Sequence, residues 1–423
     1  MTPSTERPST HSVQTRAHKL FGTVLALAAL GACGGGGAEA ASPIPTPTPV
    51  KSPGAVAPTA TLPLAQRAGA LVQRWGKPRR MLVGLGGTRP FSSILNQNLK
   101  PDIYEHYLAG LGNYTHSWDR WNSPSGAFLS LFAARADQLG AIPMFTLYQM
   151  ASWGDGNLSG LKDAAFMKNY WDNVRLMFDR IRLYGKTTLV NFEPDFWGYA
   201  QLDWAKYGTR NAKEQRALVR TVNPDCAHLP DSVAGMGQCL VHMARTQAPN
   251  ASVGFPPAMF PGIVTSEEIA YLKDVGADKA DFVVMQTLDR DAGCFEVSYT
   301  ADGALCTRPS SPPHWWWDAS NRTTPSFTSH FAKARQYHEG LGLPLIWWQT
   351  PLGVPSDTPG GTKGAFRDNR VQYFLTKPQE LVAAGAAAVV FSEGHPTQTT
   401  VDTDGGQFKR LSTRYFTAPA ALP

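Results

Sequence analysis

The sequence predicts an α/β protein folded as a single (β/α)8 TIM barrel with long loops after its strands. Two observations support this prediction. Short apolar runs recur from residue 80 onward, separated by stretches of helical length, and there are eight of them. In addition, no Gly-rich dinucleotide fingerprint follows the first run, which disfavours a doubly wound open sheet, the competing fold.

Each expected strand is a short run rich in apolar and β-branched residues. The runs lie at 81–86, 112–118, 141–150, 187–193, 252–257, 281–288, 344–350 and 387–393. Between them lie amphipathic stretches that we expect to be helices, at 125–139, 161–184, 231–246, 266–275, 326–341 and 367–384. Several of these stretches open at Ser or Asp and close near a glycine, as helix ends do. The alternation predicts a parallel sheet, and eight repeats predict its closure.

The first 33 residues have the layout of an export signal. Basic residues precede the apolar run 20–30, which is too short for a permanent membrane span. The run ends in Leu30-Gly-Ala-Cys33, which resembles the bacterial lipoprotein box. In that family the cysteine is lipidated and becomes the mature N-terminus. The resemblance implies lipidation of Cys33 and a place in the bacterial cell envelope, at the outer membrane or cell surface. Ordinary secretion after cleavage near Ala41 is the alternative.

Residues 34–79 form the expected linker between this leader, 1–33, and the barrel domain, 80–423. The linker opens with four glycines and continues with closely spaced prolines separated by Thr, Ser and Ala. Such sequences favour extended, solvated backbone and cannot bury a core. We therefore expect a semi-rigid tether that holds the barrel away from a membrane surface.

Charge and cysteine content narrow the function classes. The formal net charge of +6 is mild, and Lys and Arg are scattered, so the sequence has no electrostatic footprint for nucleic acid. Besides Cys33 there are four cysteines, an even number that in an exported chain indicates disulfides. Of the three possible connectivities we favour the local pairs Cys226–Cys239 and Cys294–Cys306. A thiol nucleophile or a metal site is the poorer alternative, because no Cys-x-x-Cys occurs.

In TIM barrels the chemistry lies at the C-terminal ends of the strands. The expected strand ends carry acids, amides and aromatic residues, and their opposite ends are bland. Aromatic faces stack on sugar C–H surfaces, and amides and acids bind hydroxyls. The residues expected to bind substrate are Asn191, Asp195, Trp197, His116, Trp118, Tyr148, Gln149, Gln286, Trp348 and Gln349.

One segment carries a family resemblance. Asn191-Phe-Glu193-Pro, at the end of the expected fourth strand, resembles the Asn-Glu-Pro of the clan A (β/α)8 glycoside hydrolases, the cellulase and mannanase group. That resemblance implies a barrel over 80–415, a general acid/base on strand 4 and a nucleophilic glutamate on strand 7. Glu193 is therefore the expected general acid. The sequence departs from the pattern at Phe192, which separates the Asn from the Glu, and at Gln349, an amide at the nucleophile position.

The second departure leaves the mechanism open. Retaining hydrolysis needs two carboxyls about 5 Å apart, and inverting hydrolysis needs roughly 6.5–9.5 Å with a water between them. With an amide at Gln349, the retaining mechanism does not transfer. The candidates for the second carboxylate are Glu393 and Asp289, which end apolar strands, followed by Asp195 and Asp119.

The sequence thus predicts an exported or surface-anchored glycoside hydrolase that cleaves a polysaccharide without cofactor or metal. We expect a monomer with a polysaccharide or oligosaccharide substrate, no nucleic-acid partner, and membrane contact only through the lipid anchor. Two alternatives remain. One is a catalytically silent carbohydrate-binding barrel lipoprotein, which Gln349 favours. The other is a polysaccharide-modifying hydrolase of another bond, such as a deacetylase, which the lack of zinc-ligand spacing disfavours.

Overall fold

The computed structural model describes residues 61–87, 91–112, 116–203, 208–287, 317–357, 361–362, 364–393 and 398–423. The leader and the linker up to residue 60 lie outside the described residues. So do three of the predicted functional residues, Asp289, Cys294 and Cys306.

Eight parallel strands close into a barrel in sequence order, which confirms the predicted fold class. The strands are β1 (Leu82–Gly86), β2 (Ile103–Ala109), β3 (Ile142–Tyr148), β4 (Thr188–Phe192), β5 (Ala251–Phe255), β6 (Phe282–Gln286), β7 (Leu345–Pro351) and β8 (Ala386–Ser392). Seven of them overlap the expected runs. Their near-continuous burial is typical of parallel strands that are covered on both faces.

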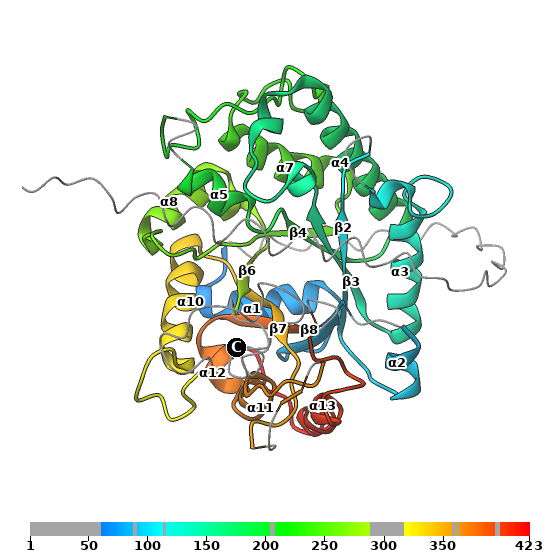
Figure 1. Ribbon diagram of the computed structural model, residues 1–423, viewed down its shortest axis with the longest axis vertical. Coiled ribbons are helices and arrows are strands. Elements are labelled where there is room, and N and C mark those ends of the chain that lie inside the picture. Colours follow the sequence, from blue (N-terminus) through cyan, green and yellow to red (C-terminus); the bar gives the residue numbers. More distant parts are fainter. Residues whose placement is uncertain are drawn as a thin grey trace, which may run out of the picture.

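Helices surround the strands, and Figure 1 shows their colours changing in chain order around the barrel, from cyan α3 to red α13. They are α2 (Phe91–Asn96), α3 (Ala127–Leu139), α4 (Ala164–Tyr184), α5 (Phe196–Leu202), α7 (Val233–Gln247), α8 (Thr265–Asp274), α10 (Phe327–Leu341), α11 (Arg370–Thr376), α12 (Pro378–Ala383) and α13 (Gln407–Thr417). The predicted caps are present in several of them. The Asp163 side chain accepts from the N–H of Phe166, and Gly185 ends α4 in the left-handed conformation. Within the described ranges, no helix is long and apolar enough to cross a membrane.

The second strand lies elsewhere than the sequence predicted. β2 is Ile103–Ala109, and the expected strand 112–118 is instead part of the loop that follows it. The apolar-run criterion missed β2 because Glu105 and His106 interrupt the run. Both are buried. Glu105 accepts a hydrogen bond from Thr146 of β3, and the His106 ring packs on Phe132 of α3 with 3.7 Å between ring centroids.

A helix closes the N-terminal end of the barrel, which we call the floor. It is α1 (Leu64–Arg74), and it lies inside the segment predicted as linker, 34–79. Residues from its last turn onward bind the beginnings of strands: Arg74 pairs with Asp281, and Trp75 Nε1 donates to Ser252 Oγ at 2.9 Å. The described end of the linker segment is therefore part of the barrel domain.

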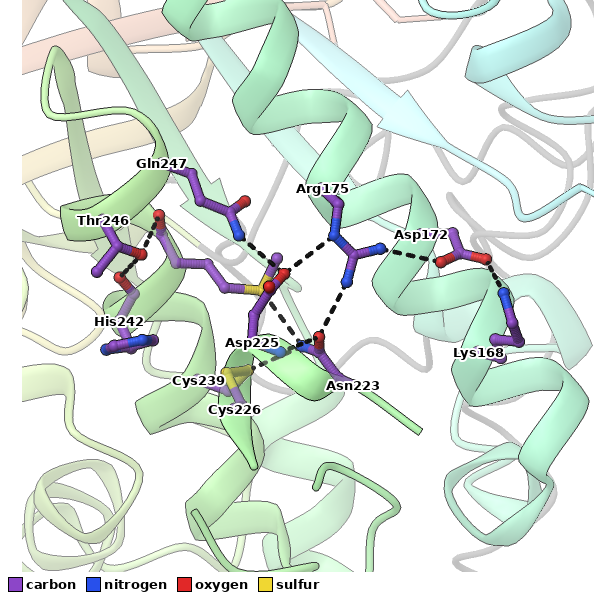
Figure 2. Close-up of polar contacts among 11 residues, drawn as sticks. Lys168, Asp172, Arg175, Asn223, Asp225, Cys226, Cys239, His242, Thr246 and Gln247 are labelled. Carbon is purple, nitrogen blue, oxygen red and sulfur yellow. Dashed lines mark hydrogen bonds and ion pairs between the residues drawn. A yellow bond between two sulfur atoms is a disulfide. The ribbon is translucent and has the colours of Figure 1, made fainter. Parts of the chain in front are cut away.

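One predicted disulfide is present in the described chain. Cys226 and Cys239 are bonded and fully buried, and they link a short 3-10 turn, Pro224–Cys226, to α7. Figure 2 shows the neighbouring polar contacts, in which Arg175 of α4 bridges Asn223 and Asp225. The disulfide and this bridge together hold the β4–β5 connection against α4. The second predicted pair, Cys294–Cys306, lies outside the described residues.

Candidate active site at the barrel mouth

The C-terminal ends of the strands form the mouth of the barrel, and contacts with the helices show which side chains face the lumen. Phe391 of β8 packs on Phe374 of α11 and on Phe408 of α13, so it points outward. Because strand side chains alternate, its neighbour Ser392 points into the lumen. By the same argument Trp347 points toward α10 and Trp348 points inward.

The pairing between neighbouring strands shows which side chains on the other strands also face the lumen. Ser392 is paired with Gly86, and Gly86 with Glu105. Further up, Tyr107 is paired with Thr146, which is paired with Asn191. Paired residues on parallel strands share a face, so these polar side chains line the lumen together.

Glu105 lies at the base of the mouth in a hydrogen-bonded row. Thr146 Oγ1 donates to its Oε1 at 2.6 Å, and Asn191 Nδ2 donates to Thr146 Oγ1 at 3.5 Å. A Cβ placed on Gly86 would lie 2.3 Å from Glu105 Oε2. The carboxylate therefore lies over Gly86 and uses the space that a side chain there would fill.

Three predicted substrate-binding residues bring buried polar atoms to the same lumen. Asn191 Oδ1, Gln286 Nε2 and Trp348 Nε1 have no hydrogen-bond partner within the described chain. Gln286 is paired with Trp348 across β6 and β7. A buried polar group left without a hydrogen bond costs about 1–3 kcal/mol, so folded proteins keep few of them. Other buried polar atoms in the described chain also lack a partner, so what distinguishes these three is that they face one lumen, where a ligand or water can bond to them.

Aromatic rings stand above this polar row. The Tyr107 ring lies 5.7 Å from the ring of Trp348 and 5.8 Å from the ring of Tyr148, measured between ring centroids. Gln349 Nε2 donates to Tyr107 Oη. Gln349 has φ +50° and sits at an irregularity in the β7–β8 pairing. The predicted residues Tyr148, Trp348 and Gln349 thus belong to the mouth, joined by Tyr107.

The carboxylate of Glu193 is bound by backbone N–H groups. It follows β4 with φ +50°, and its backbone N–H still donates to Leu147 O at 2.8 Å. Its carboxylate accepts from the backbone N–H groups of Gln149, at 3.0 Å to Oε2, and of Met150, also at 3.0 Å. The side chain is fully buried. These bonds fix the short helix η4 (Met150–Trp153) that follows β3.

The burial of Glu193 changes its protonation. Desolvation raises the pKa of Glu193 to about 8, against the opposing effect of the Met150 and Gln149 N–H groups and of the Tyr170 hydroxyl. Tyr170 belongs to α4, and its own pKa is raised well above the usual value by burial and by Glu193. Glu193 is therefore protonated at neutral pH, as a general acid must be, although in this arrangement it touches protein alone.

A pocket opens on the rim next to Tyr148. Its lining includes Tyr148, Asp155, Asp195, Phe196 and Tyr199. The Tyr148 hydroxyl donates to Asp155 Oδ1. Burial raises the pKa of Asp155, and burial together with Asp195 and Asp155 raises that of Tyr148 well above its usual value. The predicted residue Asp195 thus lies on the rim, apart from the polar side chains that face the lumen.

Four other predicted binding residues are either buried within the protein or exposed in a loop. Trp197 is buried, and its Nε1 donates to Phe192 O at 2.9 Å. Trp118 is fully buried in the loop after β2, and His116 in the same loop is exposed. The Gln149 side chain is also fully buried. None of these four side chains offers an open platform at the lumen.

The remaining carboxylates are only partly described. Glu393 follows Ser392 directly after β8 and is half-buried, which places it at the mouth two strands from Glu105. Asp289 lies outside the described residues. Within the described ranges, no three His, Cys, Asp or Glu side chains come together as metal ligands.

The sequence reasoning missed Glu105, Tyr107 and Thr146. Thr146 lies in a strand that was predicted, and it alternates with Tyr148, so its inward direction could have been inferred. Glu105 and Tyr107 share one face of β2, a strand that the apolar-run criterion did not find. Alternation within 103–109 was the available signal.

Neither a protein-family model nor a curated protein matches the chain. Among solved structures, a β-mannanase from a symbiotic protist of the termite Reticulitermes speratus is 11% identical, with 80% of this chain and 88% of that one covered and a TM-score of 0.42. A xyloglucan-specific β-1,4-glucanase from a ruminal metagenomic library is 14% identical, with 85% and 92% covered and a TM-score of 0.43. A D-allulose 3-epimerase from Methylomonas sp. is 12% identical, with 80% and 98% covered and a TM-score of 0.40.

These similar structures perform different reactions on one kind of scaffold. At these identities and TM-scores they carry no argument about what this chain does. The function has to be argued from the residues of the mouth.

Proposed function

We propose that the protein is an exported glycoside hydrolase that cleaves a polysaccharide at the mouth of its barrel. The observation that carries the proposal is the set of polar side chains that face the lumen, which we call the lumen row. In it, Glu105, Asn191 and Gln286 supply a carboxylate and two amides. The aromatic rings of Tyr107 and Trp348 face the same opening. A sugar presents hydroxyls that both donate and accept hydrogen bonds, and C–H faces that stack on rings. Both needs are met by one opening.

Glu193 is the proposed general acid, as the clan A resemblance implies. Its pKa of about 8 supports the role, because the carboxyl carries its proton at neutral pH. Its contact with a sugar oxygen requires the hydrogen bonds from Gln149 and Met150 to open. Binding of the polysaccharide beside Tyr148 would supply the energy for that rearrangement.

A silent carbohydrate-binding barrel is the second candidate. It is favoured by Gln349, since this amide stands where the clan's nucleophile would be and is bonded to Tyr107. A protein of this kind would use the same lumen row to bind sugar and would leave the glycosidic bond intact.

Reducing-end release from a panel of plant, fungal and bacterial polysaccharides separates the two candidates. Cleavage of at least one polymer by the wild type, lost in Glu193→Gln while binding is kept, is the result expected of the hydrolase. Binding without any cleavage would favour the silent barrel. Glu380→Gln, on the helix α12 far from β4 in sequence, serves as a control for the loss of a glutamate.

Export and lipidation belong to the same proposal. The buried Cys226–Cys239 disulfide supports it, because disulfides persist in oxidising compartments. The mass of the N-terminal peptide, compared between the wild type and Cys33→Ser expressed in a bacterial host, tests the lipid anchor. An unlipidated wild type cleaved near Ala41 would indicate ordinary secretion.

A further inference from the structure

We propose that Glu105 is the second catalytic carboxylate of this site, acting as the base that activates the attacking water. The inference rests on the proposed function and supplies the partner that Gln349 cannot be. It comes from the position of Glu105 within β2, a strand on which no catalytic residue was expected.

The first argument is the direction in which the Glu105 side chain points. Glu105 faces the lumen, because it is paired with Gly86 and its Oε2 lies over that glycine. Gly86 has an ordinary backbone conformation, so backbone strain does not account for a glycine there. What the missing side chain provides is room for the carboxylate.

The second argument is the set of polar atoms that share the lumen with Glu105. Thr146 holds its Oε1, and the next member of the row, Asn191, has an Oδ1 with no partner in the described chain. Gln286 Nε2 and Trp348 Nε1 are likewise unpartnered, and both residues are more than nine-tenths buried. Unpartnered polar atoms that share one lumen with a carboxylate are what a bound sugar ring and a water would satisfy.

Glu268 shows how a purely structural buried glutamate is held in this protein. Its Oε1 accepts from the N–H groups of Ala258, at 2.7 Å, and Met259, and its other oxygen accepts from the Tyr337 hydroxyl. Backbone and helix side chains surround it. Glu105 differs, since it accepts from a lumen-facing hydroxyl and lies over a glycine at the mouth.

The acid and the base stand on different strands. Glu193, after β4, and Glu393, after β8, each lie two strands from β2 in the closed barrel. Inverting glycosidases hold their carboxyls roughly 6.5–9.5 Å apart with a water between them, and retaining ones about 5 Å. A base that activates the attacking water in a single displacement gives inversion, so the proposal requires an inverted product with either residue as the acid.

The reaction is a single displacement. Glu105 takes a proton from water as the water oxygen bonds to the anomeric carbon. The glycosidic C–O bond breaks on the opposite face, and the general acid protonates the departing oxygen. One water is consumed, one hemiacetal and one alcohol are formed, and the anomeric configuration inverts.

The test uses the full-length protein and a polysaccharide that the wild type cleaves. Glu105→Gln is expected to lower kcat by about 10²–10⁴-fold with little change in KM, and to remove the acidic limb of the pH–rate profile. Azide added to Glu105→Ala is expected to restore cleavage and give a glycosyl azide, which a structural role would not produce. NMR of the first product should show the inverted anomer.

Gly86→Ala provides an independent arm that leaves the carboxyl group in place. The added methyl displaces Glu105 Oε2, and kcat is expected to fall about 10- to 100-fold in a folded protein. Glu268→Gln is the matched control for removal of a buried glutamate, with lowered stability and an unchanged pH–rate profile.

Three outcomes would overturn the assignment: a kcat within a few-fold of wild type for Glu105→Gln, no rescue by azide, or a first product of retained configuration. If Glu105→Gln does not fold, Gly86→Ala decides in its place. Failure of the proposed function has a separate signature, because in that case the wild type itself releases no reducing ends from any polymer.

Discussion

The two ends of strand β6 treat their buried polar groups in opposite ways. At the floor, Asp281 accepts from Arg74 at 2.5 Å, from Arg245 at 2.8 Å and from the N–H of Val253 at 2.9 Å. At the mouth, Gln286, the last residue of β6, carries a buried amide nitrogen without a partner in the described chain. The strand thus follows directly on a satisfied ion-pair cluster at Asp281 and ends in an unsatisfied site.

The difference separates stability from function. The charged groups at the floor bind one another, so their removal should affect folding. The polar groups at the mouth leave hydrogen bonds to be made by a ligand, so their removal should affect binding more than folding. Substitutions at the two ends should therefore have different effects.

Arg80→Ala should give the largest loss of stability. Arg80 binds both oxygens of Asp102, at 2.7 and 2.9 Å, and Asp102 is 5% exposed. Removal of the guanidinium leaves a buried carboxylate without its counter-ion, and we expect the free energy of unfolding to fall by about 3 kcal/mol. Denaturant unfolding measures the change. Lys377→Ala, which breaks an exposed pair with Glu380, should change it by less than about 1 kcal/mol.

The second prediction concerns Glu193 and pH. Its pKa rises from 4.5 to about 8 on burial, so the folded state binds the proton more tightly than the unfolded chain. The stabilisation is complete below about pH 4.5 and is lost as the pH rises toward 8. We therefore expect the free energy of unfolding to decline across this window, and to decline less steeply in Glu193→Gln. Equal slopes for the two proteins would show that Glu193 does not hold its proton in the folded state.

Gln286→Met, unlike most core substitutions, should not lower the free energy of unfolding. It replaces a side chain whose amide nitrogen is buried without a partner in the described chain by an apolar one of similar volume, so the free energy of unfolding should stay the same or rise by about 1 kcal/mol. Polysaccharide affinity should fall about tenfold, since a sugar hydroxyl loses its partner. Denaturant unfolding and binding titration are measured on the same preparation. A destabilised variant with normal affinity would contradict the contrast between floor and mouth.

Tyr107→Phe should have the smallest effect. It removes the hydroxyl that accepts from Gln349 Nε2 and keeps the ring between Trp348 and Tyr148. We expect a loss of about 1 kcal/mol in stability, and a modest rise in KM because Gln349 loses its hydrogen bond to Tyr107. Tyr415→Phe, which removes a hydroxyl bonded to Met81 O near the floor, is the matched control and should leave KM unchanged.

Sequence reasoning found the parts of this protein that depend on local order. Alternating apolar runs and helical stretches predicted the closed barrel, and the short spacing of Cys226 and Cys239 favoured the disulfide that is present. It also predicted Asn191, Gln286, Trp348 and Gln349 as mouth residues, because each stands at the end of an apolar run.

The direction and surroundings of each side chain required the tertiary structure. Glu193 looked like a rim acid, but φ +50° and the N–H groups of Gln149 and Met150 turn it into the protein interior. Glu105 looked like an interruption in an apolar run, and the structure places it in the lumen over Gly86, with a hydrogen bond from Thr146, 41 positions further along the chain. Hydrophobic periodicity depends on residues that are close together in the sequence, so it can be recognised without the structure. The partner of a buried carboxylate comes from another strand, and only the closure of the barrel brings the two together.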